Sequence, residues 1–263
     1  MSILLREQDA DGVLRLTLND PARRNALSEA MLTALGRTVE EAGRDPEVRV
    51  IVLAAEGPVF CAGHDLKEMT AGRAAQDRGR AYFTRIMGQC SAVMQGIVAC
   101  PKPVIAEVRG IATAAGCQLV ASCDLALAAE TAMFCTPGVH IGLFCSTPMV
   151  ALSRNVSNKH AMEMLLTGDM MPAARAAEIG LLNRSVAPEV LRNEVTSLAR
   201  KIASKSALTL ATGKRAFYAQ REMPLAEAYA HASQVMVENM LARDAEEGIG
   251  AFVEKRAPVW VDA

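Results

Sequence analysis

The stretch FCAGHD at residues 60–65 decides the fold, and it follows the apolar run VIVL at residues 50–53. A short, continuous apolar run is typical of a strand that is buried on both faces. The small pair Ala62-Gly63 lets a ligand approach the backbone, and free N–H groups point outward where a turn enters a helix. We therefore expect this strand to end in a turn that forms half of an oxyanion hole.

A second turn of small residues follows further along the chain. Residues 103–108 read as another strand, Arg109-Gly110 as a turn, and Ala114-Ala115-Gly116-Cys117 as the start of a helix. Both turns precede a helix, so both present backbone N–H groups. The pattern predicts that the two turns converge on one oxygen atom.

The first two thirds of the chain alternate strands and helices, which predicts an α/β fold of stacked βαβ units. The alternating Leu14, Leu16 and Leu18 predict a half-buried strand in antiparallel edge structure. The other expected elements are a helix from Ser28 to about residue 43, a strand at 49–54, a helix at 79–99, a helix at 114–123 and a strand at 124–129.

The last third is mostly helical, with Pro172 and Pro224 at helix starts and Gly168 and Gly180 at helix stops. We expect a core at residues 1–200 and a helical, oligomer-forming region at 201–263. One helix within residues 188–204 carries a single apolar stripe, formed by Leu191, Val195, Leu198 and Ile202. This stripe packs either on the chain's own core or on a neighbouring subunit.

The composition excludes several classes of function. The 263 residues are 51% apolar and 22% charged, with a net charge of −1, so no general attraction to nucleic acid or to an anionic membrane is expected. No apolar run reaches the ~18 residues of a membrane span, and the start of the chain has no signal-like pattern. Seven cysteines without a Cys-x-x-Cys pair predict reduced thiols and no metal site. We expect a cytoplasmic protein.

Four blocks of sequence resemble the crotonase, or enoyl-CoA hydratase/isomerase, superfamily. In chain order they are PARRNALS, FCAGHDLKEM, RGIATAAGCQLVASCDLALAA and AFVEKRAPVW, and the stretch FCTPGVHIGLFCSTP is similar to one branch of the family. The resemblance implies a ClpP/crotonase-like fold, an acyl-CoA thioester as substrate and a place in fatty-acid metabolism as a lyase. It also implies homotrimers, often paired into hexamers, and no cofactor besides the coenzyme A of the substrate.

The resemblance also implies roles for individual residues. It puts the two oxyanion donors at the amides of Ala62 and Ala115, where Ala115 replaces a glycine common in the family. A thioester oxygen gains negative charge when the α-carbon loses a proton or the β-carbon is attacked, and two aimed N–H groups stabilise that charge. The residues expected to contact coenzyme A are Arg23, Arg24, Ala62, Asp65, Leu66, Lys67, Phe252 and Lys255, the last two in either the same or the adjacent subunit.

The sequence departs from the family at the two glutamates that add water in a hydratase. Their positions are Gln118 and Gly138 here. Gln118 can orient a water molecule but cannot accept its proton, and Gly138 has no side chain. Ordinary hydratase chemistry is therefore not expected.

Other residues leave two alternatives open. His64 lies beside the first oxyanion turn, and the string AGHD resembles methylmalonyl-CoA decarboxylase, although the tyrosine of that enzyme aligns with Cys145. One alternative is thus decarboxylation of a malonyl-type CoA, and the other is a non-catalytic acyl-CoA-binding or regulatory protein. Glu107 and Asp124 read as structural carboxylates, and Lys214, with its charged neighbours, reads as a solvated residue.

Overall fold

The computed structural model describes residues 2–263 and contains two sheets. The larger sheet has six strands, and only its first strand runs antiparallel to its neighbour. In spatial order these strands are β1 (Leu4–Gln8), β2 (Val13–Leu18), β3 (Val50–Ala55), β5 (Val104–Val108), β7 (Leu125–Ala129) and β10 (Arg184–Val186). The expected strands at 49–54, 103–108 and 124–129 are confirmed.

The smaller sheet was not expected from the sequence. Its four strands are, in spatial order, β4 (Val59–Cys61), β6 (Ile111–Thr113), β8 (Met133–Cys135) and β9 (Met171–Pro172). Three successive strands of the large sheet are each followed by a short strand of the small one, so β4 and not β3 leads into the FCAGHD turn. Strands of two or three residues have too few positions for an alternating pattern, which explains the omission.

Helices begin and end close to the predicted residues. Ser28 caps α1 (Glu29–Arg44) by accepting a hydrogen bond from the Met31 N–H, and α3 (Arg80–Ala99) and α4 (Ala115–Ser122) follow as expected. The remaining helices of the core are α2 (Leu66–Gly72), α5 (Ser146–Leu152), α6 (Asn158–Thr167), α7 (Ala173–Glu178) and the 3-10 helices η1 (Pro21–Arg23) and η2 (Pro137–Ile141).

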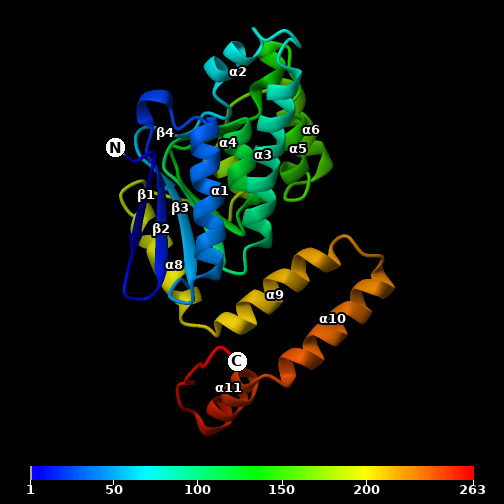
Figure 1. The fold of residues 1–263 in the computed structure, drawn as a ribbon. Helices are drawn as coiled ribbons and strands as arrows, with labels where there is room; N and C mark the ends of the chain where they lie inside the picture. Colours follow the sequence, from blue (N-terminus) through cyan, green and yellow to red (C-terminus); the bar gives the residue numbers. More distant parts are fainter. Residues whose placement is uncertain (1) are drawn as a thin grey trace.

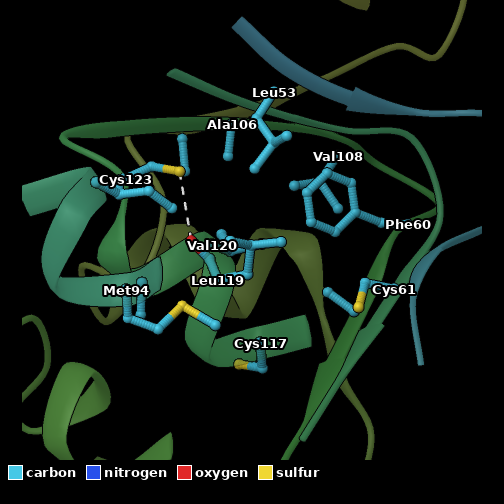
Figure 2. Packing of buried hydrophobic residues seen from close by; sticks show 14 of the residues in the cluster. Leu53, Phe60, Cys61, Met94, Ala106, Val108, Cys117, Leu119, Val120 and Cys123 are labelled. Atoms are coloured by element: carbon cyan, nitrogen blue, oxygen red, sulfur yellow. Dashed lines mark hydrogen bonds between the residues drawn. The ribbon is translucent and has the colours of Figure 1, made fainter. Parts of the chain in front are cut away.

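The large sheet is buried on both faces. Ile51 and Leu53 of β3 pack in the cluster that includes α1 and α3, whereas Val50 and Val52 face the opposite cluster. Figure 2 shows Leu53 and Phe60 packed with Val108, beside α4, so the core continues beneath the two predicted turns. The buried strands therefore fix where both turns begin.

Strand β2 corrects one prediction. It lies between β1 and β3 and is almost wholly buried, although its alternating pattern predicted half burial. Arg15 is only 7% exposed, and its guanidinium donates to the Glu107 carboxylate at 2.6 Å. A buried guanidinium is tolerated when a carboxylate pairs with it. The polar residue in the alternating pattern of β2 is therefore part of an internal ion pair and does not face solvent. Glu107 is structural, as expected.

Helix α8 (Leu191–Ala203) settles the two possibilities for the apolar stripe. Leu191 and Val195 are fully buried against strands of the large sheet, and Leu198 and Ile202 pack against the same cluster. The stripe therefore packs on the chain's own core and is not an interface.

The last three helices extend away from the sheets, as Figure 1 shows in yellow to red. They are α9 (Ala207–Gln220), α10 (Leu225–Met240) and α11 (Arg243–Glu254), and within these described residues no apolar side chain of α9 or α10 is buried. The C-terminal segment returns to the core, where Asp262 pairs with Arg49 and the Trp260 indole donates to the Ser204 carbonyl at 2.9 Å. The division at residue 200 stays a prediction.

Candidate functional site

The two predicted turns touch each other. The Thr113 hydroxyl, at the end of β6, donates to the Ala62 carbonyl at 3.0 Å. Gly63 has φ +84°, and a Cβ built on it would lie 3.2 Å from the Ala115 nitrogen. A Cβ on Gly116 would lie 2.1 Å from the Cys61 carbonyl oxygen. Close approach of two backbones thus requires glycine at both positions, as the small-residue pattern predicted.

The donor assigned to Ala62 is wrong. Its N–H donates to the Arg24 carbonyl at 3.1 Å, so it is already used inside the protein. The N–H of His64, two residues later, has no acceptor among residues 2–263, and neither has the N–H of Ala115. A sequence motif predicts where the turn lies, but it does not show which backbone N–H of the turn already donates to a carbonyl from another part of the chain. The contact with Arg24 could be found only from the structure.

Ala114 has a strained backbone directly before the second donor. Its φ of 50° and ψ of −118° fall in a region that residues with a Cβ rarely occupy. Hydrogen bonds on both sides hold it there: the Ala114 N–H donates to the Cys135 carbonyl at 2.9 Å, and the Gln118 N–H donates to the Ala114 carbonyl at 3.0 Å. Strain of this kind is concentrated at functional sites.

The His64 imidazole is mostly buried beside the first donor. Neither ring nitrogen has a hydrogen-bond partner among residues 2–263. Burial lowers the pKa of His64 below its usual value, and the nearby Leu27 backbone opposes this shift only in part. The ring is therefore neutral at pH 7, with two polar atoms available to a ligand.

The two positions of the missing glutamates differ in their surroundings. Gln118 is only 5% exposed, and its Oε1 atom has no partner among the described residues. Gly138 is crowded, because a Cβ there would lie 2.8 Å from the Leu143 carbonyl oxygen and 2.9 Å from the Cys145 sulfur. Burial raises the pKa of Cys145, so its thiol stays protonated at neutral pH. Neither position supplies a carboxylate.

The charged residues near the first turn divide into two groups. Arg23 pairs with Asp65 and with Glu68, so its guanidinium is shared with these carboxylates, and its contact with coenzyme A stays a prediction. Asp65 caps α2 by accepting from the N–H groups of Lys67 and Glu68. These hydrogen bonds hold the turn in shape and leave Asp65 as a positioning group.

Arg24, Leu66 and Lys67 are exposed beside this turn. Neither Arg24 nor Lys67 forms an ion pair with any residue of the described chain. By contrast, Phe252 lies on α11 and Lys255 directly follows it, at the far end of the molecule in Figure 1, and the structure does not bring them to this site.

A cavity of about 530 Å³ lies beside the site, between α3, α4, α5 and α9. Gln118 forms part of its wall, with Met94, Val98 and Val150 among its apolar residues. A second groove, of about 590 Å³ between α1 and α3, does not include either turn. Neither cavity could be predicted from the sequence, since both arise where helices distant in sequence meet.

A buried polar cluster next to the cavity corrects another prediction. The Lys214 side chain is 8% exposed and donates to Asp124 at 2.7 Å and to the carbonyls of Ile97 and Lys102, each at 3.0 Å. The Tyr218 hydroxyl also donates to Asp124, at 2.9 Å. Lys214 is therefore not solvated but fastens α9 to the core, and Asp124 is structural as expected.

Within residues 2–263 no three His, Cys, Asp or Glu side chains are grouped so as to hold a metal ion. In the same residues, no helix combines the length and apolar character needed to cross a bilayer.

Comparison with known proteins gives long, consistent matches. The model of the family described as enoyl-CoA hydratase/isomerase matches residues 8–263. Enoyl-CoA hydratase domain-containing protein 3, mitochondrial, of Rattus norvegicus is 48% identical over 257 residues, which cover 98% of this chain and 84% of the rat protein. The protein of the same name from Homo sapiens is 48% identical over 250 residues, covering 95% of this chain and 81% of its own length.

Solved structures match equally well. A crystal structure titled enoyl-CoA hydratase from Mycobacterium smegmatis has a TM-score of 0.94 at 51% identity and covers 99% of both chains. The crystal structure of human enoyl-CoA hydratase domain-containing protein 3 has a TM-score of 0.93 at 46% identity, and the match covers 98% of this chain and 100% of that one. The predicted fold class is confirmed, and the branch indicated by FCTPGVHIGLFCSTP is that of domain-containing protein 3.

The names of these relatives contradict the cytoplasmic location expected from the sequence, because the rat and human proteins are both called mitochondrial. The composition of a folded domain does not record its compartment, since targeting segments are removed from mature proteins. The cytoplasmic prediction is therefore wrong.

Proposed function

Because the chain belongs to the enoyl-CoA hydratase/isomerase family, we propose that it binds an acyl-CoA thioester and polarises the thioester carbonyl with the N–H groups of His64 and Ala115. The observation that carries the proposal is the contact between two turns that each hold an N–H without an acceptor. Donors fixed in a buried place stabilise an oxyanion better than mobile water does.

The reaction supported best passes through an enolate. Negative charge develops on the thioester oxygen when the α-carbon gains an electron pair, and each aimed N–H is typically worth about 3 to 4 kcal/mol when it is removed. Gln118 and Gly138 supply no general base, so water addition to an enoyl thioester is slow. The chain is thus a lyase-family protein whose hydratase activity is weak.

The nucleotide end of coenzyme A requires local cations, since the chain has a net charge of only −1. Arg24 and Lys67 are exposed near the first donor and form no ion pair within the described chain, so they suit the phosphates. Leu66, next to Lys67 in the sequence, is 53% exposed and offers an apolar contact to the adenine ring. Phe252 and Lys255 would reach coenzyme A only from an adjacent subunit.

A homotrimer, or a dimer of trimers, would cover the apolar surface of the last helices. Eight side chains of α10 and α11 and their junction are each more than half exposed, namely Leu225, Tyr229, Met236, Val237, Met240, Leu241, Phe252 and Val253. Several exposed apolar side chains on neighbouring helices are typical of subunit interfaces. Light scattering at micromolar concentration tests this proposal, and a monodisperse monomer would contradict it.

A second candidate reaction is decarboxylation of a malonyl-type CoA. Loss of carbon dioxide leaves the electron pair of the broken bond on the α-carbon, and the same two N–H groups stabilise the resulting enolate without any base. The supporting observation is the neutral His64 ring with two unpartnered nitrogens beside the donor. If no thioester is turned over although thioesters bind, the chain is a non-catalytic acyl-CoA-binding or regulatory protein.

Calorimetry with acetyl-CoA, crotonyl-CoA and free crotonate tests the proposal. Both thioesters should bind and crotonate should not, because the free acid lacks the nucleotide phosphates and the thioester oxygen. Equal or absent binding of all three compounds would reject acyl-CoA binding. A parallel assay of carbon dioxide release from malonyl-CoA and methylmalonyl-CoA separates the second candidate from the first.

A further inference from the structure

The cavity between α3, α4, α5 and α9 follows α4 toward the C-terminal end of that helix. Ala115, the second proposed donor, begins α4, and Gln118 lines the cavity almost one turn later. Ala121 lines it one further turn along, and its backbone carbonyl accepts a hydrogen bond from the Asn155 side chain at 2.8 Å. An acyl group that starts at the Ala115 N–H and follows α4 therefore leads to the segment that contains Arg154 and Asn155.

Three charged side chains are grouped at this end of the cavity. Of the described residues that line the cavity, only Arg154, Arg221 and Glu222 carry a charge. Two nitrogens of the Arg154 guanidinium lie 3.3 Å from the same Glu222 oxygen, and the Arg221 guanidinium donates to the Arg154 backbone carbonyl. Two guanidinium groups therefore share a single carboxylate.

Arg221 is the guanidinium that lacks an anion. It forms no ion pair within residues 2–263. Its position is nevertheless held, because the guanidinium carbon lies 5.7 Å from the centroid of the Phe217 ring and one N–H group is bonded to the Arg154 carbonyl. A guanidinium has five N–H donors in a planar fork that matches a carboxylate. The remaining donors of Arg221 are thus able to bind an anion in the cavity.

The length of α4 indicates how long an acyl chain must be to reach this end. Ala121 lies six residues after Ala115, which is a rise of about 9 Å along the helix. An extended chain spans roughly 1.2 Å per bond, since one residue of extended backbone has three bonds and spans about 3.5 Å. About seven bonds therefore separate the thioester carbon from a group that contacts Arg221.

The remaining wall of the cavity suits methylene groups, because Met94 and Val98 of α3 and Val150 of α5 contribute to it. A chain that ends in a methyl group would bring an apolar end to the charged residues. A chain that ends in a carboxylate would instead supply the second anion for the two guanidinium groups, through charge-assisted hydrogen bonds that are stronger than neutral ones.

We propose that this cavity binds the acyl chain of a dicarboxylic acid of about eight carbons, carried as its CoA thioester, whose free carboxylate accepts hydrogen bonds from the Arg221 guanidinium. Arg221 is then a specificity-determining residue. This inference rests on the proposed function, because it requires a CoA thioester at the two turns. Since Arg221 is exposed, added salt screens its attraction for the carboxylate.

The test compares suberyl-CoA with octanoyl-CoA, whose acyl chains are equally long and differ only in the end group. Calorimetric titration of the full-length protein at low salt should show that suberyl-CoA binds roughly fivefold more tightly, which corresponds to about 1 kcal/mol. The preference should shrink as salt is added. Glutaryl-CoA and pentanoyl-CoA form a second matched pair. Their chains are too short to reach Arg221, so glutaryl-CoA should gain nothing over pentanoyl-CoA.

Two variants change the charge at this end of the cavity in opposite directions. Arg221→Met should abolish the preference for suberyl-CoA. Glu222→Gln should increase it, because the Arg154 guanidinium loses its carboxylate partner and becomes a second cation for the ligand. Arg215→Met is the matched control, since Arg215 is exposed on α9 but does not line the cavity, and this variant should keep the wild-type preference.

Equal affinity of the wild-type protein for suberyl-CoA and octanoyl-CoA would overturn the inference and leave acyl-CoA binding intact. A preference that survives in Arg221→Met, or one that is equally large for the shorter pair, would overturn it as well. Failure of all these thioesters to bind would instead reject the proposed function itself. The wild-type comparison needs no variant, so misfolding of Arg221→Met does not remove the test.

Discussion

Gly63 and Ala115 lie in direct contact, and a Cβ on Gly63 would come within 3.2 Å of the Ala115 nitrogen. The two turns that carry the proposed donors are thus joined at one glycine whose φ is +84°. Everything proposed for the thioester oxygen depends on this contact, because it determines the distance between the two N–H groups.

Gly63→Ala should weaken both the fold and ligand binding. A left-handed backbone conformation typically costs a residue with a Cβ about 1 to 2 kcal/mol, and the new methyl group would also push against Ala114. Chemical denaturation and calorimetry with acetyl-CoA measure the two effects. Gly88→Ala is the control: Gly88 lies on α3 with nothing within 4 Å of its Cβ position, so this change should be neutral or stabilising. Unchanged binding by Gly63→Ala would contradict the proposed arrangement of donors.

Ala114→Gly should stabilise the protein, whereas a glycine added inside a helix usually destabilises it. The change removes strain at φ 50° and ψ −118°, which typically costs on the order of 1 to 3 kcal/mol. Ala92→Gly, at an exposed position inside α3, should destabilise by about 1 kcal/mol and serves as the comparison. Thermal melts of both variants give the result, and a lower melting temperature for Ala114→Gly would show that the backbone is not strained.

Wild-type protein should hydrate crotonyl-CoA far more slowly than the ~10 s⁻¹ typical of enzymes, because neither Gln118 nor Gly138 transfers a proton. Loss of absorbance by the conjugated thioester measures the rate. Gln118→Glu should raise it, since one general base is typically worth ~10² to 10⁴-fold. Gly138→Glu should instead lower stability, because its side chain would meet the Leu143 carbonyl and the Cys145 sulfur. A wild-type rate near the typical value would be incompatible with the proposed role of Gln118.

His64 should make the protein less stable as the pH falls below neutral. Burial lowers the pKa of His64 in the folded protein, whereas the unfolded chain titrates near 6.5. Between these two values the unfolded chain binds more protons, so the free energy of unfolding falls as the pH drops below about 6.5. His64→Gln should show a smaller difference in melting temperature between about pH 7.5 and about pH 5.5. His140→Gln, at an exposed histidine, should behave like the wild type.

Lys214→Met should destabilise the protein by roughly 3 kcal/mol, because it leaves the Asp124 carboxylate and two backbone carbonyls without their shared donor. Arg215→Met is the control next to it in sequence. Arg215 is exposed, so its replacement should change the free energy of unfolding by less than about 0.5 kcal/mol. Equal effects of the two changes, measured by urea denaturation, would show that the buried pair does not fasten α9.

The sequence predicted the alternating strands and helices of the core because their apolar patterns are long enough to read. Ser28 and Gly79 marked helix starts correctly, and both small-residue turns lie where they were expected. The small sheet was missed because β4, β6 and β8 have three residues each. Local patterns of that length do not distinguish a strand from a turn.

The site was predicted less well than the fold, because its details depend on contacts between distant segments. The Ala62 N–H donates a hydrogen bond to the Arg24 carbonyl, and the buried Lys214 side chain pairs with the Asp124 carboxylate. Neither partner can be identified from the residues next to it in sequence. Gln118 was recognised as a departure from the family pattern, but its unpaired oxygen and the cavity beside it were visible only in three dimensions.

The seven cysteines, all free and all buried, give the protein an internal reporter of its own unfolding. Burial raises the pKa of Cys61 and of Cys117 to about 12, so almost no thiolate is present while the core is closed. A thiol-reactive dye should therefore label the native protein only as fast as its core opens. A single cysteine placed on the surface would then be labelled alone, which makes site-specific fluorescent labelling possible without removing any native residue.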